Sequence, residues 1–174
     1  SNKRPPLYDG LPSVERHRYM DISLCCYELF AALCDGVCIG DAYASINDLN
    51  TLVNVSSDYY EIPINIYSGI SEEELEILKR IHRLRIDSSS YIKRSSSTRG
   101  ISIIPFNTIS IEPYMITIDN NDYLRYRGEL GITMRDMKNL GKTNVVGKII
   151  DYAHTLVDLI DAPASFTFKI VDSI

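Results

Sequence analysis

Strand-like and helix-like segments follow one another irregularly along this chain, and their order constrains the fold more than any other feature. Apolar and polar residues alternate, as they do in strands, in the stretches 19–26, 101–104, 108–118, 130–134 and 166–174. Helical spacing of apolar residues begins instead after Asp41, Ser71 and Thr143. Because the two kinds of segment do not alternate regularly, a doubly wound parallel sheet is excluded. The sequence predicts an α+β fold, a single compact domain in which an antiparallel sheet packs with two or three helices.

The predicted helices have start signals of different strength. Ser71 followed by Glu74 forms a capping box, and this helix is predicted to run to about Ile86. Asp41 can cap a second helix, whose apolar face would hold residues 46, 49, 52 and 53. Thr143 opens the third, and a polar, serine-rich loop is predicted over 87–100.

Length and composition are those of an ordinary globular protein. The chain has 174 residues, of which 45% are hydrophobic and 24% charged. It holds no run of about 20 apolar residues such as a membrane-spanning helix needs. The division predicted from the sequence is a flexible leader at 1–17 and a globular domain at 18–174.

A Pro-Pro-x-Tyr motif lies in the predicted leader, at Pro5, Pro6, Leu7 and Tyr8. Two prolines favour the extended polyproline II conformation, which aromatic-lined grooves of the WW type recognise. A four-residue match also arises by chance in a proline-bearing terminus. Both interpretations, a partner-binding motif and a leader that spells it by chance, are compatible with the sequence.

Basic residues are concentrated in one stretch, although the formal net charge of the chain is −5. Seven of its eighteen basic residues are Lys79, Arg80, Arg83, Arg85, Lys93, Arg94 and Arg99. Asp87 is the single acid among them. This pattern predicts a contact surface for an anionic membrane or another anionic partner, or else a solvated helix face.

The four cysteines do not have the spacing of a metal site. Cys25 and Cys26 are adjacent, and Cys34 and Cys38 lack a second ligand pair at a zinc-binding distance in sequence. Buried free thiols are therefore predicted, with no metal and no cofactor.

The segment Gly141-Lys142-Thr143 is the strongest catalytic candidate in the sequence. A phosphate-binding loop would need a glycine at position 136, where this chain has an aspartate. A turn glycine followed by a helix cap is the better interpretation. With no Gly-x-Ser-x-Gly elbow and no His-Glu-x-x-His motif, the sequence predicts a protein that is not an enzyme.

Three segments resemble the matrix proteins of rhabdoviruses. They are the Pro-Pro-x-Tyr motif, the strand at Tyr126–Met134 and the closing segment at Ala164–Ile174. The leader departs from the family pattern, because only Lys3 and Arg4 precede the motif where familiar members are rich in lysine. The acidic net charge is a second departure.

The resemblance implies a non-enzymatic viral matrix protein that self-associates, bridges the nucleocapsid and the envelope membrane, and drives assembly and budding. The implied partners are further copies in an open polymer, the viral nucleocapsid, an anionic membrane surface and a host WW-domain ubiquitin ligase, with no small-molecule substrate. Self-association is predicted at Leu11, Tyr91 and Ile92. The expected location is beneath the virion envelope, and in the host cytoplasm and at the inner face of host membranes. The alternative is a viral or bacterial effector that binds a host protein without assembling.

Overall fold

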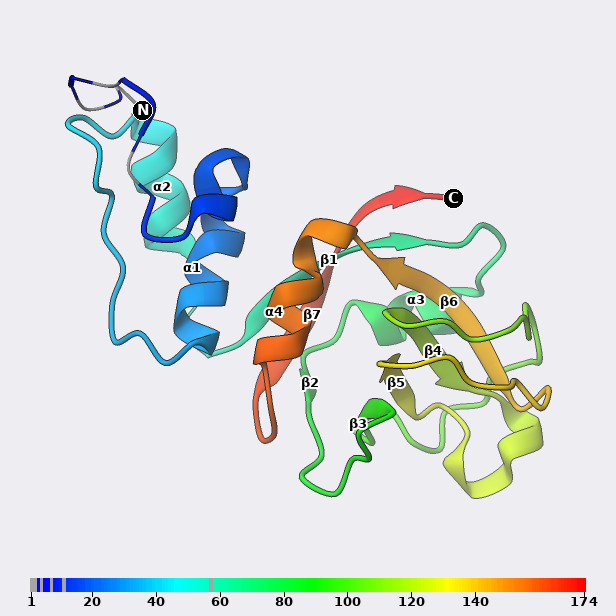
Figure 1. The fold of residues 1–174 in the computed structure, drawn as a ribbon. Coiled ribbons are helices and arrows are strands. Elements are labelled where there is room, and N and C mark those ends of the chain that lie inside the picture. The colour runs from blue at the N-terminus through cyan, green and yellow to red at the C-terminus, as the bar shows by residue number, and fades with distance from the viewer. Residues whose placement is uncertain (1–2, 4, 7, 11, 57) are drawn as a thin grey trace. The chain divides into compact units, whose positions relative to one another are not determined.

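In the computed structural model, the described residues, which are 3, 5–6, 8–10, 12–56 and 58–174, form two compact units (Figure 1). Unit 1 comprises Ser1–Ser57 and Thr155–Ile160. Unit 2 comprises Asp58–His154 and Asp161–Ile174.

Unit 1 is helical where the sequence first suggested a strand. The 3-10 helix η1 (Glu15–Tyr19) is followed by α1 (Ile22–Ala31) in place of the strand predicted at 19–26. The Asp21 side chain caps α1 by accepting hydrogen bonds from the amides of Ser23 and Leu24. Short-range alternation failed here because the buried positions 24, 26, 27 and 28 cover a broad side of a helix, which a strand pattern also fits in part.

The second helix of unit 1, α2 (Ile46–Asn54), confirms the helix predicted after Asp41. Its cap is Ser45, because the Ser45 hydroxyl accepts from the Asp48 amide at 3.1 Å. The Asp48 carboxylate accepts in return from the Ser45 amide at 3.0 Å. This reciprocal pair is a capping box, which stabilises the helix start more than Asp41 could from four residues upstream of it.

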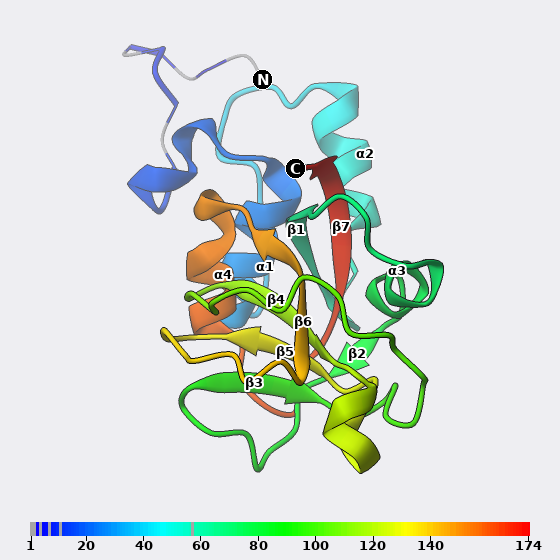
Figure 2. The same cartoon turned by 90° about the vertical axis from the view of Figure 1, so that its right-hand side faces the viewer.

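Unit 2 is built on a seven-stranded sheet within the described residues. The strands are β1 (Tyr60–Ile66), β2 (His82–Arg83), β3 (Ile92–Ser95), β4 (Met115–Asp119), β5 (Leu130–Thr133), β6 (Thr143–Ile149) and β7 (Ser165–Ser173). Their order is β2-β7-β1-β6-β4-β5-β3 (Figure 2). β1 and β7 pair in parallel, and the other neighbours pair antiparallel.

The sheet curls until its two ends nearly meet. Beyond β2, the amide of Arg85 donates to the carbonyl of Arg94 in β3 at 2.9 Å. The α+β class is therefore confirmed, but the sheet is a nearly closed barrel and not a plain antiparallel sheet packed with helices. The core of unit 2 includes fully buried strand residues, among them Ile62, Ile64, Ile116, Leu130, Ile132 and Phe166.

Two predicted helices of unit 2 differ from the structure. The capping box at Ser71 is confirmed, but its helix α3 (Glu72–Leu78) ends eight residues before Ile86, and β2 follows. The helix predicted from Thr143 is the buried strand β6. Only its distal part is helical, as the 3-10 turn η3 (Asp151–Ala153) and the short α4 (His154–Leu159), whose residues from Thr155 onward belong to unit 1. The apolar residues Val145, Val146, Ile149 and Ile150 are spaced so that they fit one face of a helix, and periodicity alone does not separate a short helix from a buried strand.

The strands predicted near the C-terminus agree with the structure better than those predicted in the middle of the chain. The stretches 130–134 and 166–174 are confirmed as β5 and β7. No regular strand forms at 101–104, and the stretch 108–118 contributes only β4 at its end. The predicted serine-rich loop contains β3, because Ile92–Ser95 pair with β5.

Gly128 is predicted to be the turn position at which a substitution destabilises the fold most. It has a φ of +77°, and a Cβ added there would lie 2.5 Å from the Thr98 carbonyl oxygen. Gly141 has a φ of +79° with nothing within 4 Å, so it serves as a control for backbone strain alone. We expect Gly141→Ala to lower the free energy of unfolding by about 1 kcal/mol. Gly128→Ala should lower it by about 3 kcal/mol, because overpacking against backbone is added.

Urea unfolding followed by circular dichroism measures both changes. Equal losses in the two variants would show that the contact with Thr98 does not constrain the turn.

Candidate functional site: an arginine-lined cleft in unit 2

One buried carboxylate, that of Glu129, gathers three arginines in unit 2. Its side chain has no exposed surface. Arg85 Nη1 lies 3.1 Å from Oε1, and Arg94 Nε lies 2.7 Å from the same oxygen. Arg99 donates from Nε to Oε2 at 2.8 Å and from Nη2 to the same oxygen. A carboxylate removed from water needs such partners, and here hydrogen bonds from Arg85 and Arg99 and the ion pair with Arg94 supply them.

The strand register brings these groups to one face of the sheet. In the pairing of β3 with β5, Arg94 lies opposite Gly131, which also lies opposite Thr117 of β4. A Cβ at Gly131 would lie 2.4 Å from Ile92 Cδ1 and 2.8 Å from Thr117 Oγ1. The missing side chain therefore leaves room above β5 for the side chains of β3 and β4.

Asp119, at the end of β4, is a second carboxyl group on this face. Its Oδ2 accepts from Arg94 Nη2 at 2.6 Å, and its Oδ1 accepts from the Thr143 hydroxyl at 2.9 Å. Burial raises the pKa of Asp119 to about 6, against the opposing effect of Arg94 and with a further upward contribution from Glu129. Part of the Asp119 population is therefore protonated near neutral pH.

A cleft of about 190 Å³ opens beside Asp119. Its polar lining is Arg94, Thr117, Asp119, Tyr123, Lys138, Asn139, Lys142 and Thr143, and its apolar lining includes Ile92, Ile111, Met137 and Leu140. The Lys142 ammonium lies 5.8 Å from the centre of the Tyr123 ring. Three cationic side chains around one titrating carboxyl group can bind an anion and can exchange a proton with it.

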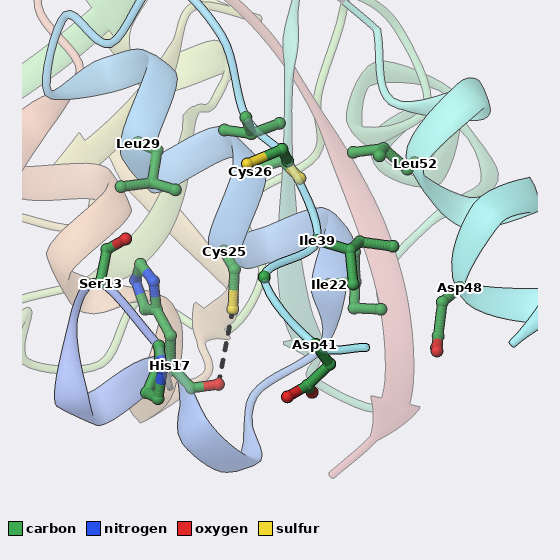
Figure 3. Close-up of a pocket in the computed structure, with 14 residues that line it drawn as sticks. Ser13, His17, Ile22, Cys25, Cys26, Leu29, Ile39, Asp41, Asp48 and Leu52 are labelled. Carbon is green, nitrogen blue, oxygen red and sulfur yellow. Dashed lines mark hydrogen bonds between the residues drawn. The ribbon is translucent and has the colours of Figure 1, made fainter. Parts of the chain in front are cut away.

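Unit 1 holds a larger cavity of about 270 Å³ with different chemistry (Figure 3). Cys25 points toward His17, and its thiol contacts the His17 carbonyl oxygen at 3.8 Å. Burial, reinforced by the charge of Glu28, raises the pKa of Cys25 to about 11, and burial also raises the pKa of Cys26. Thiols with raised pKa values are protonated and poorly nucleophilic at neutral pH. The cleft of unit 2 is therefore the stronger candidate site, although it is smaller.

All four cysteines, which lie in the described part of the chain, are free. Cys26 is buried and Cys25 half-buried, as predicted, whereas Cys34 and Cys38 are exposed. Over residues 3, 5–6, 8–10, 12–56 and 58–174, no three His, Cys, Asp or Glu side chains are grouped to hold a metal ion. Within the same ranges, no helix has the length and apolar character needed to cross a membrane.

The predicted basic cluster divides into two groups. Arg85, Arg94 and Arg99 turn toward Glu129, as described above. The other four are Lys79, Arg80, Arg83 and Lys93, of which Lys93 is half-buried in β3 and the rest are exposed. The sequence reasoning missed Glu129 and Asp119, because it compared the cluster only with the acid inside the same stretch. The available signal was Glu129 itself, a charged residue at the start of an apolar alternating strand.

The other predicted site residues lie in several places. Pro5, Pro6 and Tyr8 are exposed residues of unit 1, and Leu7 and Leu11 lie outside the described residues. Tyr91 is exposed, with the Arg135 guanidinium 5.0 Å from its ring centre. Ile92 begins β3 and lines the cleft. It is therefore part of the candidate site, although the sequence indicated it only as an apolar residue for self-association.

The Gly141-Lys142-Thr143 segment is a turn, as predicted, with Gly141 at positive φ. Thr143 begins β6 and does not cap a helix. Lys142 and Thr143 both line the cleft, so the segment contributes to the candidate site without forming a phosphate-binding loop.

Comparison with known proteins gives one family for both units. Residues 1–54 match the family model described as 6-phospho-N-acetylmuramidase, N-terminal. Residues 60–169 match the model described as 6-phospho-N-acetylmuramidase, C-terminal. The gap between the two matches contains the boundary between the units, at 57/58. No curated protein matches.

Two solved structures share this fold. An uncharacterized Bacillus cereus protein has 30% sequence identity and a TM-score of 0.85, over 97% of this chain and 50% of its own. A conserved Enterococcus faecalis protein of unknown function has 28% identity and a TM-score of 0.70, over 98% of this chain and 47% of its own. The chain thus spans about half the length of each.

The family matches show that the resemblance to rhabdovirus matrix proteins was wrong. The same matches contradict the predicted function, both as a viral matrix protein and as a host-directed effector. They also contradict the predicted viral and host partners, the virion location and the prediction that the protein is not an enzyme. The segments that carried the resemblance, Tyr126–Met134 and Ala164–Ile174, contain the strands β5 and β7. Alternating strands of this kind occur in many folds, so short matches to them are weakly specific.

Removing the charge of Glu129 should destabilise unit 2. Glu129→Gln would leave three arginines around a neutral amide, and we expect it to lower the free energy of unfolding by about 3 kcal/mol. Glu112→Gln is the matched control, because Glu112 is exposed and only forms a 3.3 Å ion pair with Lys148. The control should cost at most about 0.5 kcal/mol. Urea unfolding of both variants checks this, and equal stabilities would contradict the structural role given to Glu129.

Asp119→Asn should make the stability less dependent on pH. Because the pKa of Asp119 is raised in the folded state, the folded protein holds its proton more tightly than the unfolded chain does. The wild type should therefore lose stability as the pH rises from about 4 to 6, by up to about 3 kcal/mol. Asparagine cannot titrate, so the variant should be the more stable protein at pH 7.5, and this gain should shrink at pH 4.5. Thermal unfolding at the two pH values measures the difference, and a gain that is the same at both would refute the assignment.

Proposed function

The chain belongs to the 6-phospho-N-acetylmuramidase family, and from this premise we propose that it takes part in hydrolysing glycosidic bonds of 6-phosphorylated N-acetylmuramic compounds. The observation that carries the proposal is the match of family models to both units, over residues 1–54 and 60–169. The substrate is then a small, anionic sugar derivative. The protein would be a bacterial enzyme or part of one.

The chemistry of such a substrate suits the cleft of unit 2. A 6-phosphorylated muramic compound carries a phosphate and a carboxylate on one sugar. Arg94, Lys138 and Lys142 are the cationic side chains that line the cleft, and both anionic groups are ones that arginine and lysine recognise. We assign the anionic group of the substrate to this cleft, with Tyr123 and the apolar lining beside the sugar.

The two carboxyl groups of the site would have different roles. Glycosidases pair a proton-donating carboxyl group with a second carboxylate at the scissile bond. Asp119 lines the cleft, and its pKa of about 6 suits proton exchange near neutral pH. Glu129 is fully buried and held by three arginines, so its role is to position Arg94. The cleft therefore supports substrate binding more directly than bond cleavage.

Calorimetric titration tests this assignment. We expect N-acetylmuramic acid 6-phosphate to bind at least about tenfold more tightly than the unphosphorylated sugar, because one charge-assisted contact contributes about 1.4 kcal/mol or more. Lys142→Ala should weaken binding of the phosphorylated sugar by about tenfold for the same reason. Lys169→Ala is the control, since Lys169 is an exposed residue of β7, which lies three strands from β4 in the sheet order.

Two results would contradict the assignment. One is equal affinity for the phosphorylated and unphosphorylated sugars. The other is unchanged binding by Lys142→Ala. Release of the phosphorylated sugar from one of its glycosides tests hydrolysis separately.

A further inference from the structure

Arg94 lies between two carboxyl groups that differ in their access to the cleft. Its Nε lies 2.7 Å from Glu129 Oε1, and its Nη2 lies 2.6 Å from Asp119 Oδ2. Glu129 has no exposed surface and is shared with Arg85 and Arg99. Asp119 keeps 8% of its side-chain surface and lines the cleft. On the side of Arg94 that faces the cleft, an anion of the protein itself is therefore already in place.

A ligand anion would compete with Asp119 for this arginine. Two negative groups on one guanidinium repel each other, and burial increases that cost. Protonation of Asp119 removes the repulsion. Asp119 can stay in place when protonated, because its Oδ1 still accepts from the Thr143 hydroxyl at 2.9 Å and its new O–H can donate to a ligand oxygen.

Charged groups face Asp119 from several elements; the cationic ones attract a ligand anion, while Arg94 also opposes the protonation of Asp119. β3 contributes Arg94, and the residue before β5 is Glu129, which is paired with three arginines. The turn before β6 contributes Lys138 and Lys142, and the 3-10 helix η2 (Asn121–Tyr126) contributes Tyr123. Protonation of Asp119 makes the net charge of the cleft lining more positive by one unit, and this attracts an anion.

We propose that the cleft takes up a proton together with its anionic ligand, because the ligand replaces Asp119 as the partner of Arg94 and Asp119 binds the proton. The inference rests on the proposed function, since it concerns the same cleft. The free protein already holds Asp119 near its titration point, with a pKa of about 6. Each pH unit above that value adds about 1.4 kcal/mol to the free energy needed to protonate Asp119.

The linkage fixes the sign of the pH dependence. Below about pH 6, Asp119 is already protonated in the free protein, so the dissociation constant should not change with pH. Above that value the bound form keeps a proton that the free form has lost. The dissociation constant should then rise about tenfold for each pH unit.

The test needs an anionic probe whose own charge is constant. A phosphate monoester titrates near pH 6, whereas a sulfate monoester is ionised throughout the range of interest. The probe is therefore N-acetylglucosamine 6-sulfate, titrated calorimetrically at pH 5.5, 6.5 and 7.5 in two buffers of different ionisation enthalpy. We expect about tenfold weaker binding at pH 7.5 than at pH 6.5, with uptake of about one proton.

Two variants sharpen the test. Asp119→Asn mimics the protonated state, so it should bind at pH 7.5 as tightly as the wild type does at pH 5.5 and take up no proton. Asp136→Asn removes an exposed acid from the neighbouring loop and should keep the pH dependence of the wild type. This control separates a specific exchange at Asp119 from a general change in charge.

The outcomes separate this inference from the proposed function. Binding of the probe that does not depend on pH, or weaker binding by Asp119→Asn, would overturn proton-coupled exchange and leave the cleft as the binding site. Binding of N-acetylmuramic acid 6-phosphate without binding of the sulfate probe at pH 5.5 would also overturn it. Failure of both sugars to bind the wild type and Asp119→Asn at every pH would overturn the proposed function as well.

Discussion

The pairing of one buried carboxylate with three arginines fixes the arrangement of unit 2 where its sheet is least complete. β2 and β3 are short, and just beyond β2 a backbone hydrogen bond from the Arg85 amide to the Arg94 carbonyl in β3 joins the two ends of the sheet. The side chains of the same two residues meet at Glu129, just before β5, and Arg99 joins them from the following loop. Side-chain charge thus replaces the ladder hydrogen bonds that a longer strand would provide. Both carboxylate oxygens accept hydrogen bonds, from Arg85 and Arg99, which offsets part of the cost of desolvation, whereas Arg94 Nε contributes an ion pair without a hydrogen bond.

The candidate cleft of unit 2 lies beside this seam, because Arg94 takes part in both. Arg94 is held from one side by Glu129, so its guanidinium is already oriented before any ligand arrives. Burial and the charge of Glu129 raise the pKa of Asp119 toward neutrality, and Arg94 acts in the opposite direction. At Gly131, the side chains of Ile92 and Thr117 fill the space that a Cβ would need. The ion cluster around Glu129 and the candidate cleft thus share Arg94.

The sequence allowed prediction of those elements whose signals are local. The capping box at Ser71, the helix α2 and the strands β5 and β7 follow from neighbouring residues, and the structure confirms them. β6 was not predictable in this way, because the spacing of Val145, Val146, Ile149 and Ile150 also fits one face of a helix. The candidate site depends on contacts that are distant in sequence. Glu129 lies 30 residues from Arg99 and 44 from Arg85, so the cluster of basic residues was visible but its partner was not.

The central claim is that the cleft of unit 2 recognises the anionic group of a phosphorylated amino sugar. A crystal structure of the protein with N-acetylmuramic acid 6-phosphate tests this claim most directly. We expect a phosphate or carboxylate oxygen of the sugar to contact Arg94 and Lys142, with Glu129 still bound to its three arginines. A sugar bound only in the cavity of unit 1, or bound in unit 2 without contact to Arg94, would contradict it.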